Sequence, residues 1–164
     1  MNEPKIKQWA TVYATNEFTS INTCSGYRRS ARDPQGISVF YEPSVRDEEL
    51  GEGLLQALAA SRFLSPAEID AFFDPKAVEQ NYEDWVARSM QRYGYKKRSE
   101  LFKGMKHCVI DRVDGVVTMK PSKHEKPEAW SGTGIRETDY ERVGPNASPA
   151  DVGAALRRCL AKCT

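Results

Sequence analysis

Residues 37–62 have the sequence ISVFYEPSVRDEELGEGLLQALAASR, in which an apolar strand pattern is followed by a proline and then by a helical pattern. The first five residues are mostly β-branched or aromatic, as in strands. Leu50, Leu54 and Leu58 recur every four residues and therefore lie along one face of a helix. Ser44 and Asp47 have the spacing of a helix N-cap. The stretch predicts a strand, a turn and a helix that packs one apolar stripe against a sheet.

A similar pattern returns 102 positions later, near the C-terminus. Pro43 corresponds to Pro145 and Gly51 to Gly153, and the second apolar stripe consists of Val152, Leu156 and Leu160. A glycine costs a helix about 1 kcal/mol relative to alanine, so we expect both glycines to permit a close approach of helix to sheet. The chain would then contain a two-fold internal pseudo-repeat of strand-turn-helix units that serve packing. The alternative is a chance likeness of two amphipathic helices.

Length and composition indicate one domain, spanning residues 1–164, of ordinary globular composition. Hydrophobic residues make up 40% of the chain and charged residues 29%, which is usual for globular proteins. No run approaches the roughly 18 apolar residues of a membrane span, and the stretch MNEPKIKQWATVYA lacks the apolar core of a secretory signal. The four cysteines match no disulfide scaffold. We therefore expect a cytoplasmic protein with reduced thiols.

The remaining patterns predict the order strands, helices, hairpin, strand, helix. The expected elements are strands at 9–15 and 21–27, helices at 65–73 (capped by Ser65), 74–93 (ended by Gly94) and 99–103, a hairpin at 107–120, a strand at 140–143 and a final helix capped by Ser148. Strand 21–27 is expected to be weak, part loop or edge strand, because Asn22, Ser25 and Gly26 are poor strand formers. Residues 121–134 are polar and predict a long loop. This order predicts an α+β fold with a mostly antiparallel or mixed sheet and helices packed on it.

The hairpin is the clearest local signal, because Asp114-Gly115 predicts a two-residue type I′ turn. That turn sets the pairing, with Val113 opposite Val116 and the rest of both strands following. One face then presents Cys108, Ile110, Val117 and Met119. We expect this face to point into the core. The other face, with His107, Val109, Asp111 and Thr118, is expected to meet solvent or a partner.

Charge is distributed unevenly along the chain although the net charge is +1. Residues 42–90 contain eleven Asp or Glu against four Lys or Arg, a local charge of −7. Residues 91–131 contain ten basic residues against five acidic ones, a local charge of +5. The pattern indicates a molecule with two oppositely charged surfaces. The alternative is that the exposed faces of these helices are simply acidic.

No catalytic arrangement is evident. His107 and Cys108 are adjacent on a strand and point to opposite faces, so they cannot act as base and nucleophile together. Cys159 and Cys163 lie four apart on a helix without a zinc motif, so we expect no metal. One alternative to a binding protein stays open, a thiol-dependent enzyme that uses Cys24 or Cys108.

A second alternative is a nucleic-acid-binding module. The basic run 96–98 with Tyr93 and Tyr95 resembles a small nucleic-acid patch, although the neighbouring acidic block argues against it. An acidic helical surface with aromatic residues instead favours a protein-binding role without catalysis.

Six stretches of the sequence carry a resemblance to a known family. They are 20–27 (SINTCSGY), 36–39 (GISV), 58–64 (LAASRFL), 93–95 (YGY), 105–108 (MKHC) and 154–160 (AALRRCL). In these stretches the chain resembles, nearly end to end, the CdiI immunity proteins of bacterial contact-dependent growth inhibition. The resemblance implies a cytoplasmic protein, not an enzyme, that binds and neutralises the C-terminal toxin domain of a cognate CdiA effector. Many such toxins are nucleases, tRNases among them. No cofactor, membrane, small-molecule substrate or direct nucleic-acid contact is implied.

A nuclease presents a basic substrate cleft, so an inhibitor gains speed and specificity of association from opposing carboxylates. We therefore expect the acidic helices after residue 62 to form the toxin-binding surface. The residues expected to contact the toxin are Glu68, Asp70, Glu79, Glu83 and Asp84. Trp130 is a second candidate anchor, because buried aromatic residues often carry interface energy. The alternative for Trp130 is a tryptophan folded back on the core.

Overall fold

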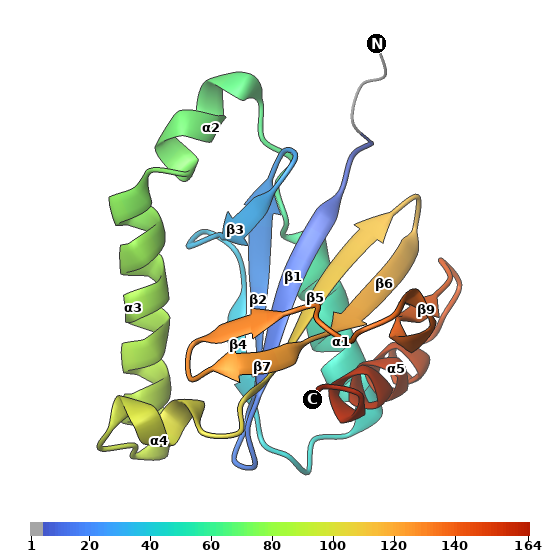
Figure 1. The fold of residues 1–164 in the computed structure, drawn as a ribbon. Helices are drawn as coiled ribbons and strands as arrows, with labels where there is room; N and C mark the ends of the chain where they lie inside the picture. Colours follow the sequence, from blue (N-terminus) through green and yellow to red (C-terminus); the bar gives the residue numbers. More distant parts are fainter. Residues whose placement is uncertain (1–4) are drawn as a thin grey trace.

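One antiparallel sheet lies between two layers of helices in the computed structural model, which describes residues 5–164 (Figure 1). The four preceding residues, part of the stretch expected to lack a secretory signal, lie outside the described residues. The strands are β1 (Gln8–Ala14), β2 (Thr19–Gly26), β3 (Ser30–Arg32), β4 (Ser38–Tyr41), β5 (Lys106–Val113), β6 (Val116–Pro121), β7 (Lys123–Lys126), β8 (Ala129–Ser131) and β9 (Glu141–Val143). The helices are α1 (Asp47–Ala59), α2 (Pro66–Phe72), α3 (Pro75–Tyr93), α4 (Arg98–Phe102) and α5 (Pro149–Ala161).

The main sheet has the strand order β3-β2-β1-β5-β6-β9, and β4 also pairs with β2 on its outer side. Each of these pairings is antiparallel. Strands β7 and β8 form a separate hairpin. The predicted α+β class with an antiparallel sheet and packed helices is therefore confirmed.

The central hairpin has the predicted turn and register. Asp114 and Gly115 both adopt positive φ angles, 51° and 78°, as a type I′ turn requires. Val113 pairs with Val116, and Ile110 pairs with Met119. The predicted core face is buried, with exposed fractions of 2% or less for Cys108, Ile110, Val117 and Met119. The turn formed by Asp114 and Gly115 therefore determines which side chains of the hairpin point into the core.

Strand β2 corrects the expectation of a weak or edge strand at 21–27, because all eight of its residues are buried between β1 and the β3 and β4 pair. Its polar side chains have buried partners. The Thr23 hydroxyl donates to the carbonyl oxygen of Ala57 at 2.7 Å, and the Ser25 hydroxyl donates to the Asp33 carboxylate at 2.6 Å. Satisfied polar groups are tolerated in a core, so poor strand formers occupy an interior strand.

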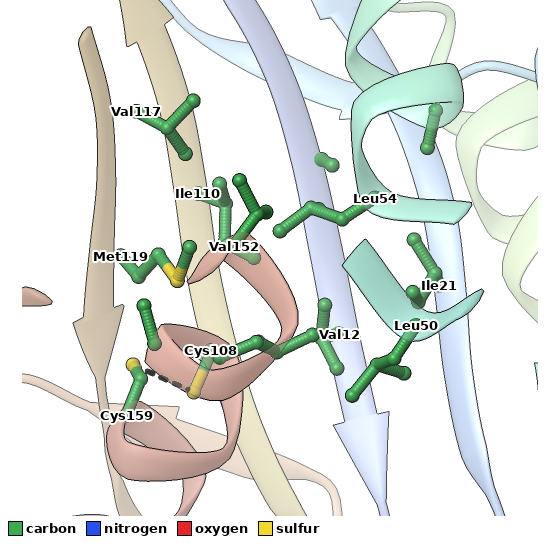
Figure 2. Close-up of a cluster of buried hydrophobic side chains, with 14 of the residues drawn as sticks. Val12, Ile21, Leu50, Leu54, Cys108, Ile110, Val117, Met119, Val152 and Cys159 are labelled. Carbon is green, nitrogen blue, oxygen red and sulfur yellow. Dashed lines mark hydrogen bonds between the residues drawn. The ribbon is translucent and has the colours of Figure 1, made fainter. Parts of the chain in front are cut away.

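The two faces of the sheet have separate cores, because successive strand residues point to opposite sides. Val12 faces the layer of α1 and α5, where Leu50 and Leu54 of α1 meet Val152 of α5 (Figure 2). Tyr13 faces the layer of α3 and α4, where it packs against the fully buried Trp85. The first core is aliphatic and the second is aromatic.

Gly51 and Gly153 lie at the crossing of α1 and α5, which corrects the expectation that they approach a sheet. A β-carbon on Gly51 would overlap the carbonyl oxygen of Pro149. One on Gly153 would overlap the carbonyl oxygen of Asp47. Each glycine therefore admits the first turn of the other helix. The strands that precede these helices, β4 and β9, lie at opposite edges of the sheet; an internal repeat of the two units stays a prediction.

Most expected helix ends are confirmed, with two exceptions. The side chains of Asp74 and Ser148 cap α3 and α5 by accepting hydrogen bonds from Ala77 N and Asp151 N, and the left-handed Gly94 ends α3. Helix α1 instead begins after Arg46, not at Ser44. Three acidic residues in its first turn complement the helix dipole and replace a side-chain cap. Ser65 lies at the N-cap of α2, but its hydroxyl donates to the Glu68 carboxylate at 3.1 Å instead of accepting from the backbone.

The predicted long loop at 121–134 is wrong, because it contains the β7-β8 hairpin. The sequence of this hairpin does not alternate between polar and apolar residues, so it lacks the usual strand pattern. The ring of His124 stacks on Trp130 with centroids 5.0 Å apart. The amide of His124 donates to the carbonyl oxygen of Thr164 at 2.8 Å, at the far end of the chain.

The helix crossing predicts an unusual cost for Gly51→Ala. Alanine favours a helix, but the obstacle here is a backbone carbonyl, so α1 and α5 must move apart. We expect the free energy of unfolding to fall by about 1–3 kcal/mol, as in other overpacked cores, measured by urea denaturation. Gly53→Ala is the matched control in the same helix, because its β-carbon would meet the flexible end of the Tyr41 side chain. A loss no greater than that of the control would contradict this account.

Candidate functional site

The acidic residues predicted to contact a partner lie on α2 and α3, which stand along one side of the sheet (Figure 1). Helix α3 is fixed by its apolar side, where the Trp85 indole donates to the Ser20 hydroxyl of β2 at 3.0 Å. Its remaining surface is free to carry charge. Four of the five predicted carboxylates are exposed and Glu83 is half-buried; the exposed residues are Glu68, Asp70, Glu79 and Asp84.

The five carboxylates do not form one cluster, because they lie on different sides of the two helices. Asp84 lines a cavity of about 220 Å³ between α3 and the β3-β4 turn, together with Arg32 and Arg88. Glu68 lines a second cavity of about 510 Å³ between α2 and α3, together with Phe72. The structure therefore offers two neighbouring hollows, each lined by both acidic and basic residues, in place of one acidic patch.

Glu83 is engaged in an ion-pair network on the opposite flank of α3. Arg98 of α4 binds both oxygens of Glu83, at 2.7 and 2.9 Å, and contacts Glu128 at 2.6 Å. The Tyr82 hydroxyl also donates to Glu128 at 2.8 Å. Hydrogen bonds from Arg98 lower the pKa of both carboxyl groups. Glu83 thus ties α3 to α4 and to the β7-β8 turn, and its charge is largely compensated.

The same network removes most of the candidate nucleic-acid patch. Arg98 is paired with two carboxylates, so among residues 5–164 the charge of the basic run 96–98 that is left without an ion pair is that of its two lysines. Tyr93 stacks on the buried Phe18 with centroids 4.7 Å apart. Tyr93 and Tyr95 are both half-buried and pack against the aromatic core, which argues against a free stacking platform for bases.

Trp130 lies in β8 and is folded toward the core, as the alternative interpretation expected. Its indole donates to the carbonyl oxygen of Met105 at 3.0 Å. One side of the ring stacks on His124, and its edge meets Tyr13 at 5.5 Å between centroids. The residue is half-buried, so only part of the ring is available to a partner.

His107 lies among aromatic side chains, although the hairpin pattern placed it on the face that was expected to meet solvent or a partner. Its ring stacks on Tyr13 at 4.5 Å and meets Trp130 at 5.4 Å between centroids. Within residues 5–164, neither buried ring nitrogen has a hydrogen-bond partner. Burial, aided by the nearby positive charge of Arg32, lowers the pKa of His107 to about 4. The ring is therefore neutral at pH 7, which suits an aromatic core.

The two cysteines considered as nucleophiles are poorly suited to that role. Cys24 is 3% exposed and Cys108 is fully buried. Burial raises the pKa of Cys24, and hydrogen bonds with Cys159 and Cys163 raise that of Cys108. A nucleophilic cysteine needs access and a lowered pKa. The geometry argues against a thiol-dependent enzyme that uses either residue.

In the described residues, 5–164, no helix has both the length and the apolar character needed to cross a bilayer.

Comparisons with known proteins identify close relatives along the whole chain. The model of the CdiI family, described as CDI immunity protein, matches residues 8–163. Immunity protein CdiI-YPIII of Yersinia pseudotuberculosis serotype O:3 (strain YPIII) is 36% identical over 176 residues, covering 99% of both chains. A CdiA-CT/CdiI toxin and immunity complex from Yersinia pseudotuberculosis contains a chain with a TM-score of 0.90 and 35% identity, covering 97% of this chain and 98% of that one. A protein of unknown function from Neisseria meningitidis has a TM-score of 0.88 and 34% identity, covering 100% of this chain and 99% of that one.

The lowered pKa of His107 predicts an acid-dependent loss of stability. The unfolded chain binds a proton near pH 6.5 and the folded chain only near pH 4, so stability is lost as the pH falls between these values. The expected loss is on the order of 3 kcal/mol at pH 4, measured by urea denaturation across this range. His107→Phe keeps the aromatic stack and should flatten the dependence, whereas His124→Phe should retain it. Equal pH profiles for wild type and His107→Phe would contradict the assignment.

Proposed function

The chain belongs to the CdiI family of CDI immunity proteins, and on this premise we propose that it binds and neutralises the C-terminal toxin domain of a cognate CdiA effector. The observation that carries the proposal is the end-to-end likeness to a chain solved in a CdiA-CT/CdiI toxin and immunity complex. The relatives are immunity proteins, not enzymes. We infer that the 164 residues act as one immunity domain in the cytoplasm and need no cofactor or small-molecule substrate.

We propose that the toxin domain is a nuclease. A tRNase is one type of nuclease that meets this description. Support comes from the acidic charge of residues 42–90 and from the exposed carboxylates of α2 and α3. A nuclease must attract phosphates and therefore presents positive charge around its active site. Carboxylates held on rigid helices oppose that charge, so docking would occlude the active site or the surface that binds nucleic acid.

The proposed toxin-binding surface comprises the exposed sides of α2 and α3 and the two hollows beside them. Asp84 and Glu68 line those hollows, where a side chain of the toxin could be buried next to a carboxylate. The surface consists of Glu68, Asp70, Glu79, Glu83 and Asp84, with Trp130 as a further contact. Glu83 contributes less, because Arg98 already compensates its charge.

The function is tested by mixing purified toxin domain and immunity protein. We expect the two to co-purify, and the toxin alone to degrade RNA or DNA at a rate that one equivalent of immunity protein suppresses. Bacteria that express the toxin domain should grow only when the immunity protein is also expressed. Failure to bind or protect would overturn the function, whereas binding without nuclease activity of the free toxin would overturn only the toxin class.

The surface is tested by reversing charge at Glu68, Asp70, Glu79 and Asp84 together, which leaves the Glu83–Arg98 pair intact. We expect the affinity for the toxin to fall about 100-fold, mainly through slower association at low salt. Adding Glu83→Lys should weaken binding further. The control reverses four exposed carboxylates away from α2 and α3, namely Glu17, Glu42, Glu52 and Glu137, and changes the net charge equally. Unchanged affinity of the five-fold variant would exclude this surface without affecting the immunity function.

Trp130→Phe tests the remaining contact in the same binding assay. Phenylalanine keeps an aromatic ring beside His124 but loses the hydrogen bond to Met105. We expect the affinity to fall about tenfold. Trp9→Phe is the control, because Trp9 is only 7% exposed. An affinity equal to that of the control would remove Trp130 from the surface.

A further inference from the structure

Three of the four cysteines meet where the end of α5 packs against β5. The sulfur of Cys108 lies 3.1 Å from that of Cys159 and 3.7 Å from that of Cys163. Figure 2 shows the first of these contacts as a dashed line at the edge of the aliphatic core. Cys24 lies elsewhere: it follows Thr23, which faces α1, so its own side chain points to the other face of the sheet.

The three thiols differ in access to solvent. Cys108 and Cys159 are fully buried. Cys163 lies beyond Ala161, the last residue of α5, and is half-buried. In the described part of the chain no group of His, Cys, Asp or Glu is arranged to hold a metal ion. The cluster is therefore a set of free thiols with one member near the surface.

Cys108 and Cys163 also differ in acidity. A hydrogen bond with Cys108 lowers the pKa of Cys163 to about 6, and the positive charge of Lys106 acts in the same direction. Hydrogen bonds with Cys159 and with Cys163 raise the pKa of Cys108, so the Cys108 thiol keeps its proton more readily than Cys163 does. The more accessible sulfur is therefore also the more acidic of the two, and hence the more reactive toward an oxidant.

We propose that Cys163 is a peroxide-sensitive thiol whose oxidation is resolved by Cys108, which produces a disulfide between the end of α5 and β5. The inference is independent of toxin binding. It rests on the 3.7 Å separation of the two sulfurs and on the exposure of one partner only. A hydroperoxide reaches Cys163 first, while the resolving thiol is already in contact with it.

The chemistry proceeds in two steps. The Cys163 thiolate attacks a peroxide oxygen, so that an S–O bond forms, the O–O bond breaks, and the alkoxide or hydroxide leaves and takes a proton. Cys163 is thereby oxidised to a sulfenic acid and the peroxide is reduced. The Cys108 sulfur then attacks the sulfenic sulfur; an S–S bond forms, the S–O bond breaks, and the hydroxide leaves as water with the Cys108 proton.

Formation of the disulfide requires a movement of the C-terminus. A disulfide needs the sulfurs about 2.05 Å apart, so the residues after α5 must shift to close the 3.7 Å gap between Cys163 and Cys108. Their backbone is bonded to β7 and the residue before it: Thr164 N donates to Ser122 O at 3.1 Å and Thr164 O accepts from His124 N at 2.8 Å. Formation of the disulfide would therefore shift the contacts between the C-terminus and the β7-β8 hairpin.

The test treats the full-length protein with hydrogen peroxide, followed by alkylation of free thiols and peptide mapping. Trypsin cleaves after Arg158 and Lys162, which separates Cys159 from Cys163. We expect the wild type to lose two of its four thiols and to yield a Cys108–Cys163 peptide that dithiothreitol releases. Cys163→Ser should retain its three thiols, and Cys24→Ser, the matched control, should form the disulfide as the wild type does.

A second variant separates the two steps. In Cys108→Ala the sulfenic acid loses the thiol in contact with it, so dimedone should label a several-fold larger fraction of the oxidised Cys163 than in the wild type. Cys163→Ser is the safer variant for folding, because it changes a residue beyond the helix end. The proposal is overturned if the wild type retains all four thiols, if Cys163→Ser forms a disulfide at the wild-type rate, or if dimedone labels Cys24 in preference to Cys163.

Discussion

The close approach of α1 and α5 is the constraint on which the rest of the structure depends. Two glycines allow each helix to meet a backbone carbonyl at the start of the other, so both helices fit side by side on one face of the sheet. Their leucines and valines fill that face together with Val12, Ile110 and Met119. The same packing brings the end of α5 onto β5, where three cysteines meet. The layer of α1 and α5 therefore both fills one face of the sheet and positions the cysteine cluster.

The opposite face is built from aromatic rings and carries the candidate surface. Tyr13, Trp85 and His107 stack across the sheet, and Trp130 closes the stack from β8. This core holds the inner side of α3, so its outer side is left for charge. Arg98 then joins α3, α4 and the β7-β8 turn through Glu83 and Glu128. A rigid helix with exposed carboxylates is a suitable element for fast and specific association with a basic partner.

The acidic block of the sequence is used in more than one way in the folded protein. A count of charges along the sequence gives every carboxylate the same weight. In the structure, the charge of Glu83 is compensated by Arg98, whereas its neighbour Asp84 lines an open hollow. Position on the helix decides this difference, because adjacent residues point about 100° apart. The predicted partner surface therefore has two sides. On one side the carboxylate of Glu83 is paired with an arginine, and on the other the carboxylate of Asp84 lines a hollow.

The sequence by itself determined what depends on neighbours along the chain. Asp114-Gly115 fixed the hairpin register, and Asp74, Gly94 and Ser148 fixed helix ends, because turns and caps are formed within a few residues. Resemblance of six short stretches also indicated the family correctly. Tertiary structure alone decided the interior place of β2, the partner of each glycine, the β7-β8 hairpin, the position of Trp130 and the meeting of Cys108 with Cys163. These features join residues from distant parts of the chain, and their energies arise only when folding brings both partners together.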